Sequence, residues 1–257
     1  MISLWLDVPR DAYDYVVAEL WDAGTEGISE DGNILRAFFP SENTAAELLE
    51  RFAAYSPHIH VEQEHDWVAE VRERWRPFPV GDRFWMSPEW YADPPPPGRL
   101  RLTIYPGMAC GTGRAPATRT CLELMERRLV PGQSVFDVGT GTGILAAAAN
   151  LLGARPVLAC DIEPEAAAIA RANLDSEVGV FAGSLRSVRS SGVDVVVANL
   201  NAETLKANAA ELLRVTRGYL ILGGFREDEA EAVKTALPGA LQDQSAIDNW
   251  LALAIVV

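Results

Sequence analysis

The chain has 257 residues, of which 49% are hydrophobic, and a formal net charge of −14 at neutral pH. This length and apolar content suffice for one large or two modest domains with a sizeable core. The acidic excess argues against a general nucleic-acid-binding surface, because phosphate contacts need lysine and arginine. A basic protein partner fits the charge better.

The N-terminal stretch and the cysteines indicate the compartment. The opening residues MISLWLDVPRDAYDYVV are interrupted by charged side chains, which is not the pattern of a signal peptide. No apolar run reaches membrane-spanning length. Cys110, Cys121 and Cys160 form no CxxC pair, so we expect buried thiols and no metal site. We therefore expect a cytoplasmic protein with no membrane contact.

Residues 1–65 predict a small α+β domain. Strand formers alternate with polar residues over 2–8 and 34–39, and a helical period covers 10–23 and ends at Gly24. The full set of predicted elements is a strand at 2–8, a helix at 10–23, strands at 27–29 and 34–39, a helix at 42–54 and a strand at 58–64. This βαββαβ order is that of the split ferredoxin-like unit.

Residues 66–79 predict a connecting helix. Trp67, Val71 and Trp75 are spaced by four and share one face, which favours interdomain packing. Pro77 and Pro79 end this helix. Two strands follow, at 83–86 and 100–105, around a proline-rich loop.

Residues 80–257 predict a second, larger α/β domain. Its helices fall at 116–129, 144–152, 164–174 and 202–214, and its strands at 135–138, 157–160, 178–181, 193–199, 219–225 and 250–257. Strands that alternate with helices predict an open, doubly wound and mostly parallel sheet. Ligands of such sheets bind at the carboxyl ends of the strands.

The stretch VFDVGTGTG places Gly139, Gly141 and Gly143 between a strand and a helix. Glycine lets a ligand approach the backbone closely, and the following helix presents free amides. The GxGxG spacing is not the GxGxxG of dinucleotide sites, since Ile144 stands where the third glycine would be. A lysine for a phosphate-binding P-loop is also missing here.

Asp161 ends the next strand, in LACDIEP. A carboxylate there suits a ribose diol, so the pattern predicts a nucleoside without pyrophosphate, such as S-adenosylmethionine (SAM). We assign Asp137, Gly139, Gly141, Gly143 and Asp161 to cofactor binding. Plainer alternatives remain at this stage: a tight glycine turn, an Asp161 that only caps a helix, and an Asp137 that is a buried structural acid rather than a ligand of the SAM ammonium group.

Four stretches carry a resemblance to a known family. They are PGMACGTGRAPATRTCLELME (106–126), FDVGTGTGILAAAA, DIEPEA and VVVANLNAETL. They resemble PrmA, the bacterial family that methylates ribosomal protein L11, which belongs to the class I SAM-dependent methyltransferases. The resemblance implies SAM contacts from Thr118, Gly139, Asp161 and Asn199. It also implies that residues 1–65 recognise the substrate protein.

The implied chemistry is methyl transfer to a lysine or N-terminal amine of L11 by a monomeric enzyme. The acceptor must be neutral, although a free lysine has a pKa near 10.4, and a dry site favours the neutral form. Asn199 is the candidate catalytic residue, since its side-chain oxygen can orient the amine. We find no obvious general base, because His58, His60 and His65 fall in or beside the first domain.

The chain departs from the family pattern in the loop before the first helix of the second domain. GTGRAPAT stands where the family reads GTGxHPTT, so Ala115 and Ala117 replace a histidine and a threonine, and Cys110 replaces a phenylalanine. Asn201 adds a polar group where NILA is usual. These changes leave two alternatives open: a SAM-binding module that docks on the ribosomal protein without turnover, and a methyltransferase with another acceptor.

Overall fold

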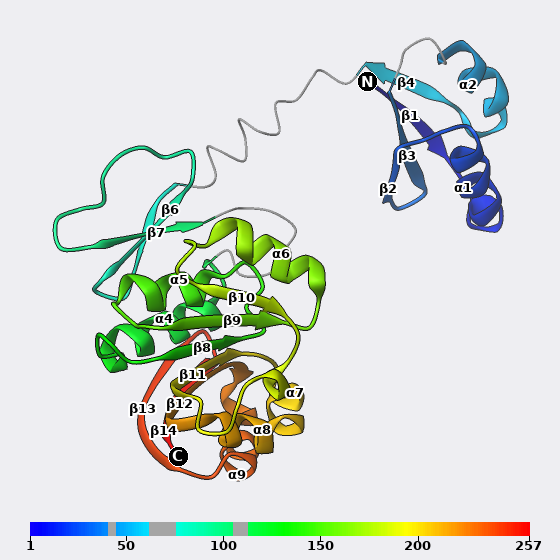
Figure 1. Ribbon diagram of the computed structural model, residues 1–257. Coiled ribbons are helices and arrows are strands. Elements are labelled where there is room, and N and C mark those ends of the chain that lie inside the picture. The colour runs from blue at the N-terminus through cyan, green and yellow to red at the C-terminus, as the bar shows by residue number, and fades with distance from the viewer. Residues whose placement is uncertain (41–44, 62–75, 105–112) are drawn as a thin grey trace. The chain divides into compact units, whose positions relative to one another are not determined.

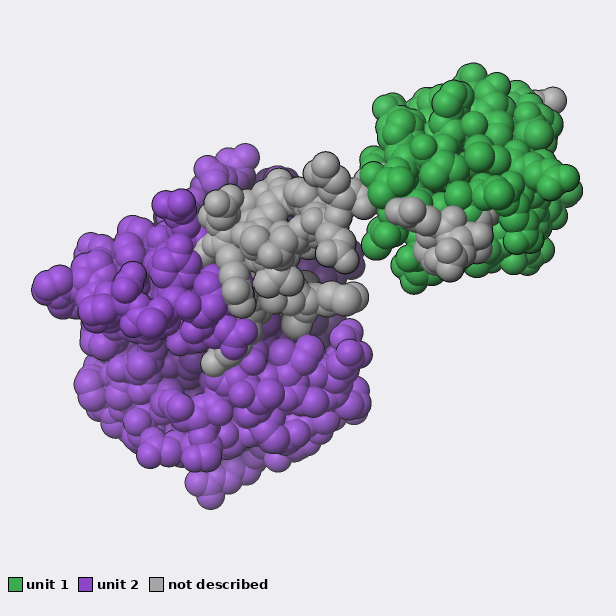
Figure 2. All heavy atoms as spheres, turned by 90° about the horizontal axis from the view of Figure 1, so that it is seen from above, with its two compact units in different colours: residues 1–74 green, residues 75–257 purple. Residues whose placement is uncertain are grey.

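The structure is a computed structural model that describes residues 1–40, 45–61, 76–104 and 113–257. The chain divides into two compact units, Met1–Arg74 and Trp75–Val257, which Figure 2 colours separately and Figure 1 shows as ribbons. Most of the connecting helix predicted at 66–79 lies outside the described residues, as does Cys110.

The first unit is a four-stranded antiparallel sheet with two helices. The strands are β1 (Ile2–Asp7), β2 (Gly27–Asp31), β3 (Ile34–Phe39) and β4 (His58–Val61), in the order β2-β3-β1-β4. The helices are α1 (Tyr13–Asp22) and α2 (Ala45–Arg51), each next to a 3-10 turn, η1 (Arg10–Ala12) and η3 (Ala53–Tyr55). Ile2, Leu4 and Leu6 alternate along β1 into one core with Val16 and Leu20 of α1.

The opposite face of this sheet carries an aromatic group. Trp5 of β1 points away from the core, and the guanidinium of Arg36 lies 4.9 Å from its ring centroid and 5.0 Å from that of Phe38. The ring of His60 is 4.8 Å from the ring of Trp5. Both histidines of the described part of the chain, His58 and His60, are therefore in β4 of this unit.

The second unit is built on a seven-stranded sheet. Its strands are β8 (Val135–Val138), β9 (Val157–Asp161), β10 (Gly179–Ala182), β11 (Val193–Asn199), β12 (Thr216–Arg226), β13 (Ala240–Ile247) and β14 (Trp250–Val256). Their order is β10-β9-β8-β11-β12-β14-β13. The pairs from β10 to β12 are parallel and the last two are antiparallel. The mostly parallel sheet predicted from the sequence is thereby confirmed.

Helices cover both faces of this sheet (Figure 1). The first group is α4 (Pro116–Arg128), α5 (Ile144–Leu151) and α6 (Pro164–Asn173), and the second is α7 (Ala202–Ala207), α8 (Ala209–Val215) and α9 (Ala230–Ala236). Val195 and Val197 of β11 enter the core with α4 and α5, whereas Val196 and Ala198 enter the core with α7, α8 and α9. A strand buried on both faces explains the unbroken apolar run VVVA.

A small three-stranded sheet packs on the α4–α5 side. It consists of β5 (Phe78–Val80), β6 (Phe84–Pro88) and β7 (Leu100–Ile104), in that order. The sequence analysis did not predict β5 and used Pro79 to end a helix. Pro79 instead lies in an edge strand, where a missing backbone N–H costs no ladder hydrogen bond.

One further prediction is wrong, and two elements of this unit were not predicted. The single helix predicted at 202–214 is wrong, because the helix breaks at Asn208 into α7 and α8. Helix α9 and strand β13 were not predicted. The β13–β14 hairpin turns at Asp248 and Asn249, both with positive φ, as a two-residue hairpin turn requires. Among the helices in the described ranges, none is long and apolar enough to cross a membrane.

Candidate functional site

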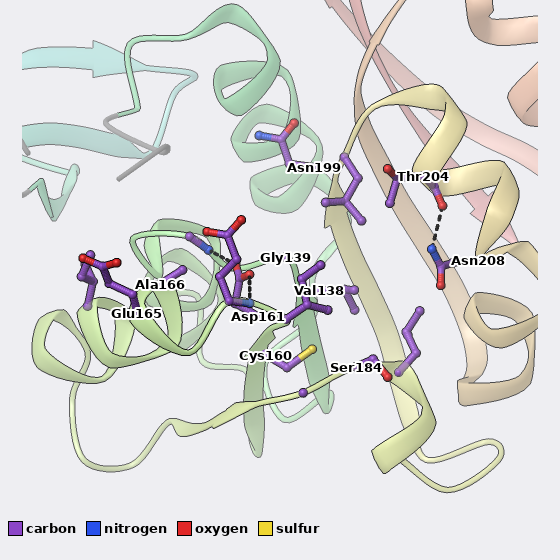
Figure 3. Close-up of a pocket in the computed structure, with 17 residues that line it drawn as sticks. Val138, Gly139, Cys160, Asp161, Glu165, Ala166, Ser184, Asn199, Thr204 and Asn208 are labelled. Atoms are coloured by element: carbon purple, nitrogen blue, oxygen red, sulfur yellow. Dashed lines mark hydrogen bonds between the residues drawn. The ribbon is translucent and has the colours of Figure 1, made fainter. Parts of the chain in front are cut away.

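A cavity of about 610 Å³ opens at the carboxyl ends of β8, β9, β10 and β11 (Figure 3). Parallel strands end at one edge of the sheet, so the residues that follow them meet there. The wall is formed by Val138, Gly139, Gly141, Cys160, Asp161, Ile162, Glu163, Glu165, Ala166, Ile169, Gly183, Ser184, Leu185, Asn199, Leu200, Thr204 and Asn208. Of the residues predicted for the site, Gly139, Gly141, Asp161 and Asn199 share this wall.

The glycine loop after β8 is held against β9. The amides of Gly139 and Thr140 both donate to the carbonyl oxygen of Cys160, at 2.9 and 3.0 Å. Gly139 has φ +71, and a Cβ atom built on it would lie 2.5 Å from Cδ2 of Leu200. A side chain at position 139 would therefore be strained and would enter the wall of the cavity.

Asp161 joins two loops at the edge of the sheet. Its Oδ2 accepts from the amide of Gly141 at 3.0 Å, and its Oδ1 accepts from the amide of Glu163 at 3.1 Å. The N-cap position of α6 belongs to Glu163, not Asp161. A carboxylate fixed in this way presents its remaining lone pairs to the cavity, where hydroxyl donors can reach them.

Asp137 lies behind the glycine loop and is only 1% exposed. Its Oδ2 accepts from the Thr140 hydroxyl at 2.7 Å and from the Ala146 amide at 3.1 Å. Burial raises the pKa of Asp137 to about 6, against the effect of these two hydrogen bonds. Its Oδ1 is buried and has no hydrogen-bond partner in the described part of the protein. One carboxylate oxygen is thus structural and the other remains available.

Asn199 ends β11 and is bonded to α4. Its Nδ2 donates to the hydroxyl of Thr118, 3.3 Å away. Thr118 is 3% exposed and is not on the wall of the cavity. The structure therefore brings Thr118 to the site through Asn199.

Gly143 is also not on this wall. It has φ +87 at the N-cap of α5, and a Cβ atom there would lie 2.9 Å from the side chain of Leu174. It lines a separate recess of only about 10 Å³ with Thr103 and Asn173. In the structure, the lack of a side chain at Gly143 lets helix α5 begin close to Leu174.

The departures from the family pattern have local structural settings. Ala115 occupies the N-cap position of α4 and makes no side-chain cap, and Ala117 is buried in the first turn of α4. Asn201 is the N-cap of α7, and its side chain accepts from the amide of Thr204 at 2.8 Å. The extra polar group in NLNA thus caps a short helix.

Sequence reasoning missed one side of the cavity. Ser184 and Leu185 follow β10, so the rule used for Asp161 and Asn199 could have found them. Ile162 is 76% exposed beside Asp161 and lines the cavity. Asn208 could not be assigned to the cavity from the sequence, because it falls in the middle of the helix predicted at 202–214.

The arrangement combines an apolar slot with polar groups at its edges. Val138, Ile162, Leu185 and Leu200 supply apolar walls, and Asp161 supplies the negative charge for a diol. None of the described residues on the wall is histidine or lysine. The site suits a nucleoside with a polar tail better than a phosphorylated ligand, which would need cationic partners.

Comparisons with known proteins place the chain in a family. The family model for ribosomal protein L11 methyltransferase (PrmA) matches residues 11–256. A ribosomal protein L11 methyltransferase from Burkholderia lata is 38% identical over 199 residues, which cover 76% of this chain and 66% of that protein. One from Burkholderia cenocepacia is 39% identical over 174 residues, which cover 66% of this chain and 58% of the relative. The matched regions therefore cover less than two thirds of the length of each of these two relatives.

A solved structure agrees with this assignment. The crystal structure of a ribosomal protein L11 methylase from Lactobacillus delbrueckii subsp. bulgaricus superposes with a TM-score of 0.64 at 28% identity, covering 70% of this chain and 97% of that one. The sheet order and this likeness give the chain the class I methyltransferase fold.

Proposed function

The chain belongs to the ribosomal protein L11 methyltransferase (PrmA) family, and from that premise we propose that it is a SAM-dependent methyltransferase of ribosomal protein L11. The observation that carries the proposal is the cavity in which Gly139, Asp161 and Asn199 meet at the ends of three parallel strands. In this proposal Asp161 holds the ribose diol, and the backbone at Gly139 and Gly141 faces the rest of the nucleoside.

The residues present fit SAM. The Gly139 cradle would be filled by a Cβ atom, and the unpartnered Oδ1 of Asp137 supports a contact with an ammonium group. Gly143 and Thr118 complete the proposed cofactor set, the first by shaping the loop and the second by holding Asn199. When bound, SAM supplies a methyl group already activated by its sulfonium, so positioning accounts for much of the acceleration.

The acceptor in this proposal is a lysine or N-terminal amine. Because the hydroxyl of Thr118 takes a hydrogen bond from Nδ2 of Asn199, Oδ1 of Asn199 is left to accept from the amine and orient its lone pair. The apolar walls favour the neutral amine by desolvation.

We propose the domain organisation as 1–65, a ferredoxin-like domain that recognises the substrate protein, 66–79, a linker, and 80–257, the methyltransferase domain. The helix predicted for the linker ends before Phe78, where strand β5 begins. The βαββαβ order and the strand order β2-β3-β1-β4 support the first of these. The net charge of −14 suits a basic ribosomal protein better than nucleic acid. The enzyme in this proposal is a cytoplasmic monomer.

The test is intact-mass spectrometry of L11 after incubation with this protein and SAM. We expect methyl-sized mass steps, and fragmentation then assigns them to lysine or to the N-terminus. The control is the same reaction with the Asp161→Ala protein, which should give no steps. Unmodified L11 together with SAM binding in calorimetry would overturn the activity. A labelled-methyl screen of a lysate would then separate a non-catalytic docking module from an enzyme with another acceptor.

A further inference from the structure

Asn208 stands in the break between α7 and α8 and faces the cavity (Figure 3). It is the N-cap residue of α8, where an asparagine side-chain oxygen ordinarily accepts from an amide of the first turn. No such side-chain bond is made here. A side-chain oxygen that makes no cap bond and lies beside a binding cavity is a candidate for a ligand contact.

The direction of the Asn208 amide is fixed by its neighbour. Both the backbone N–H and Nδ2 of Asn208 donate to the carbonyl oxygen of Thr204, at 3.1 and 2.9 Å. A carbonyl oxygen only accepts, so a flipped amide would place two oxygens against each other. Figure 3 shows the nitrogen turned to Thr204 and Oδ1 turned away from it. Oδ1 and the second N–H of Nδ2 remain for a ligand.

The order of the strands determines where each end of the proposed ligand lies. Gly139 and Asn199 follow β8 and β11, on one side of β9, and Ser184 and Leu185 follow β10, on the other. With the ribose on Asp161 at the end of β9, and the reactive tail toward Asn199, the base lies toward β10.

The wall at the β10 end is firmly built. Arg214 of α8 donates to the carbonyl oxygens of Leu185 and Val188, at 3.0 and 2.8 Å. The 3-10 turn that follows β10 is therefore tied to α8, the helix that begins after Asn208, and Leu185 of this turn shares the cavity wall with Asn208. The base slot then has Leu185 as an apolar surface and the Asn208 amide as a polar edge.

We propose that Asn208 selects the base: its Oδ1 accepts from the 6-amino group of adenine and discriminates against a 6-oxopurine. Asparagine matches adenine through this acceptor and its adjacent N–H. A 6-oxo group would set an oxygen against Oδ1, and the bond to Thr204 prevents the compensating flip. This inference rests on the proposed SAM function and concerns a residue outside the catalytic set.

The test is calorimetric binding of S-adenosylhomocysteine and S-inosylhomocysteine, which differ in the 6-substituent of the base. For the unmodified protein we expect the adenosyl compound to bind about 10-fold tighter or more, the effect of one mismatched buried hydrogen bond. Asn208→Leu should weaken adenosyl binding and bring the two affinities close to equality. Thr204→Val changes the same wall without touching the backbone carbonyl and is the matched control.

The outcomes separate the two proposals. If Asn208→Leu, folded by its thermal transition, binds the adenosyl compound with the original preference, the base-reading role of Asn208 is wrong and the SAM site stands. If Thr204→Val abolishes the preference and Asn208→Leu does not, the hydroxyl of Thr204 is the reader instead. If the unmodified protein binds neither compound, the proposed cofactor itself is wrong.

Discussion

Asn199 and Thr118 are 81 residues apart in the chain, yet Nδ2 of Asn199 lies 3.3 Å from the hydroxyl oxygen of Thr118. The bond joins the end of the central strand β11 to the first turn of α4. Thr118 is buried and is not on the wall of the cavity. Through this bond it orients the side chain of Asn199, which lies on that wall.

Removing the Thr118 hydroxyl should therefore slow transfer more than it weakens binding. We expect Thr118→Val to lower kcat by about 10- to 100-fold through misplacement of Asn199. Affinity for S-adenosylhomocysteine should change much less, and Thr118→Ser should restore most of kcat. Steady-state kinetics with SAM and L11, together with calorimetry, measure both. Equal losses in binding and kcat would instead make Thr118 a direct cofactor contact.

In the proposed cofactor site, replacing Asp161 should remove the anchor of the ribose. Asp161→Asn loses the charge that strengthens hydrogen bonds to hydroxyl groups, and its NH₂ opposes an amide donor from Gly141 or Glu163. We expect SAM affinity to fall by about 10- to 100-fold. Asp175→Asn is the control, because the Asp175 carboxylate is bonded to the Asn150 side chain and is not on the cavity wall. Unchanged SAM affinity in Asp161→Asn would exclude the assigned pocket.

Two glycines with similar positive φ angles allow the effect of backbone strain to be separated from the effect of steric crowding. Gly139 has φ +71 with Leu200 at 2.5 Å from a built Cβ atom, whereas Gly98 has φ +84 and nothing within 4 Å. We expect Gly139→Ala and Gly98→Ala each to lose about 1–2 kcal/mol of unfolding free energy from the positive φ. Only Gly139→Ala should also weaken SAM binding. Chemical denaturation and calorimetry on both variants check this, and equal binding by the two would contradict a crowded cradle.

Asp137 should make stability depend on pH in an unusual direction. Because burial raises its folded pKa from 3.8 to about 6, the folded state binds the proton more tightly than the unfolded state. The free energy of unfolding then falls as pH rises from about 4 to 6, by about 3 kcal/mol in total. Asp137→Asn removes this contribution, so the variant should gain relative to the parent as pH rises through this window. A parent–variant difference that is constant between pH 4 and 7 would show that Asp137 stays ionised.

Asp194 should make stability depend on pH in the opposite direction. Its bond to Arg217 at 2.6 Å, with help from Ser134, holds its pKa well below the usual range. The stabilisation is complete above the unfolded pKa near 4 and is lost as pH falls through the folded pKa. Asp194→Asn should therefore be less stable than the parent at pH 6, with a gap that narrows in acid. A gap that widens toward low pH in denaturant titrations would contradict this assignment.

The mostly parallel sheet of the second unit could be predicted from the sequence because its strands and helices have strong periodic patterns. The run VVVAN of β11 and the alanine-rich α5 were placed to within a residue or two. Strand β13 was missed because an edge strand with one solvated face, ALQDQSAI, lacks an apolar run. Tertiary packing decides such strands.

Residues of the cavity wall were identified from the sequence where a local rule applies and missed where it does not. Strand ends and glycine turns are local features, so Gly139, Asp161 and Asn199 could be found from the chain alone. The bond from Asn199 to Thr118 depends on how α4 packs beside β11, which no local pattern encodes. The break at Asn208 interrupts a segment rich in alanine and leucine that mostly favours helix, and the packing of α7 and α8 on the sheet reveals it.

The position of β14 has a consequence for synthesis. In space β14 lies between β12 and β13, although it follows both in the chain. Strand β14 is made after both and forms a hairpin with β13, so this hairpin can pair with β12 only once β14 has left the ribosome. Helices α7 to α9 pack partly on Leu251, Leu253 and Ile255 of this strand, so their core closes only after it arrives. The smaller unit needs none of these residues and can fold while the rest is still being made. We expect a nascent chain halted before residue 250 to protect the first unit from protease and to leave α7 to α9 open to it.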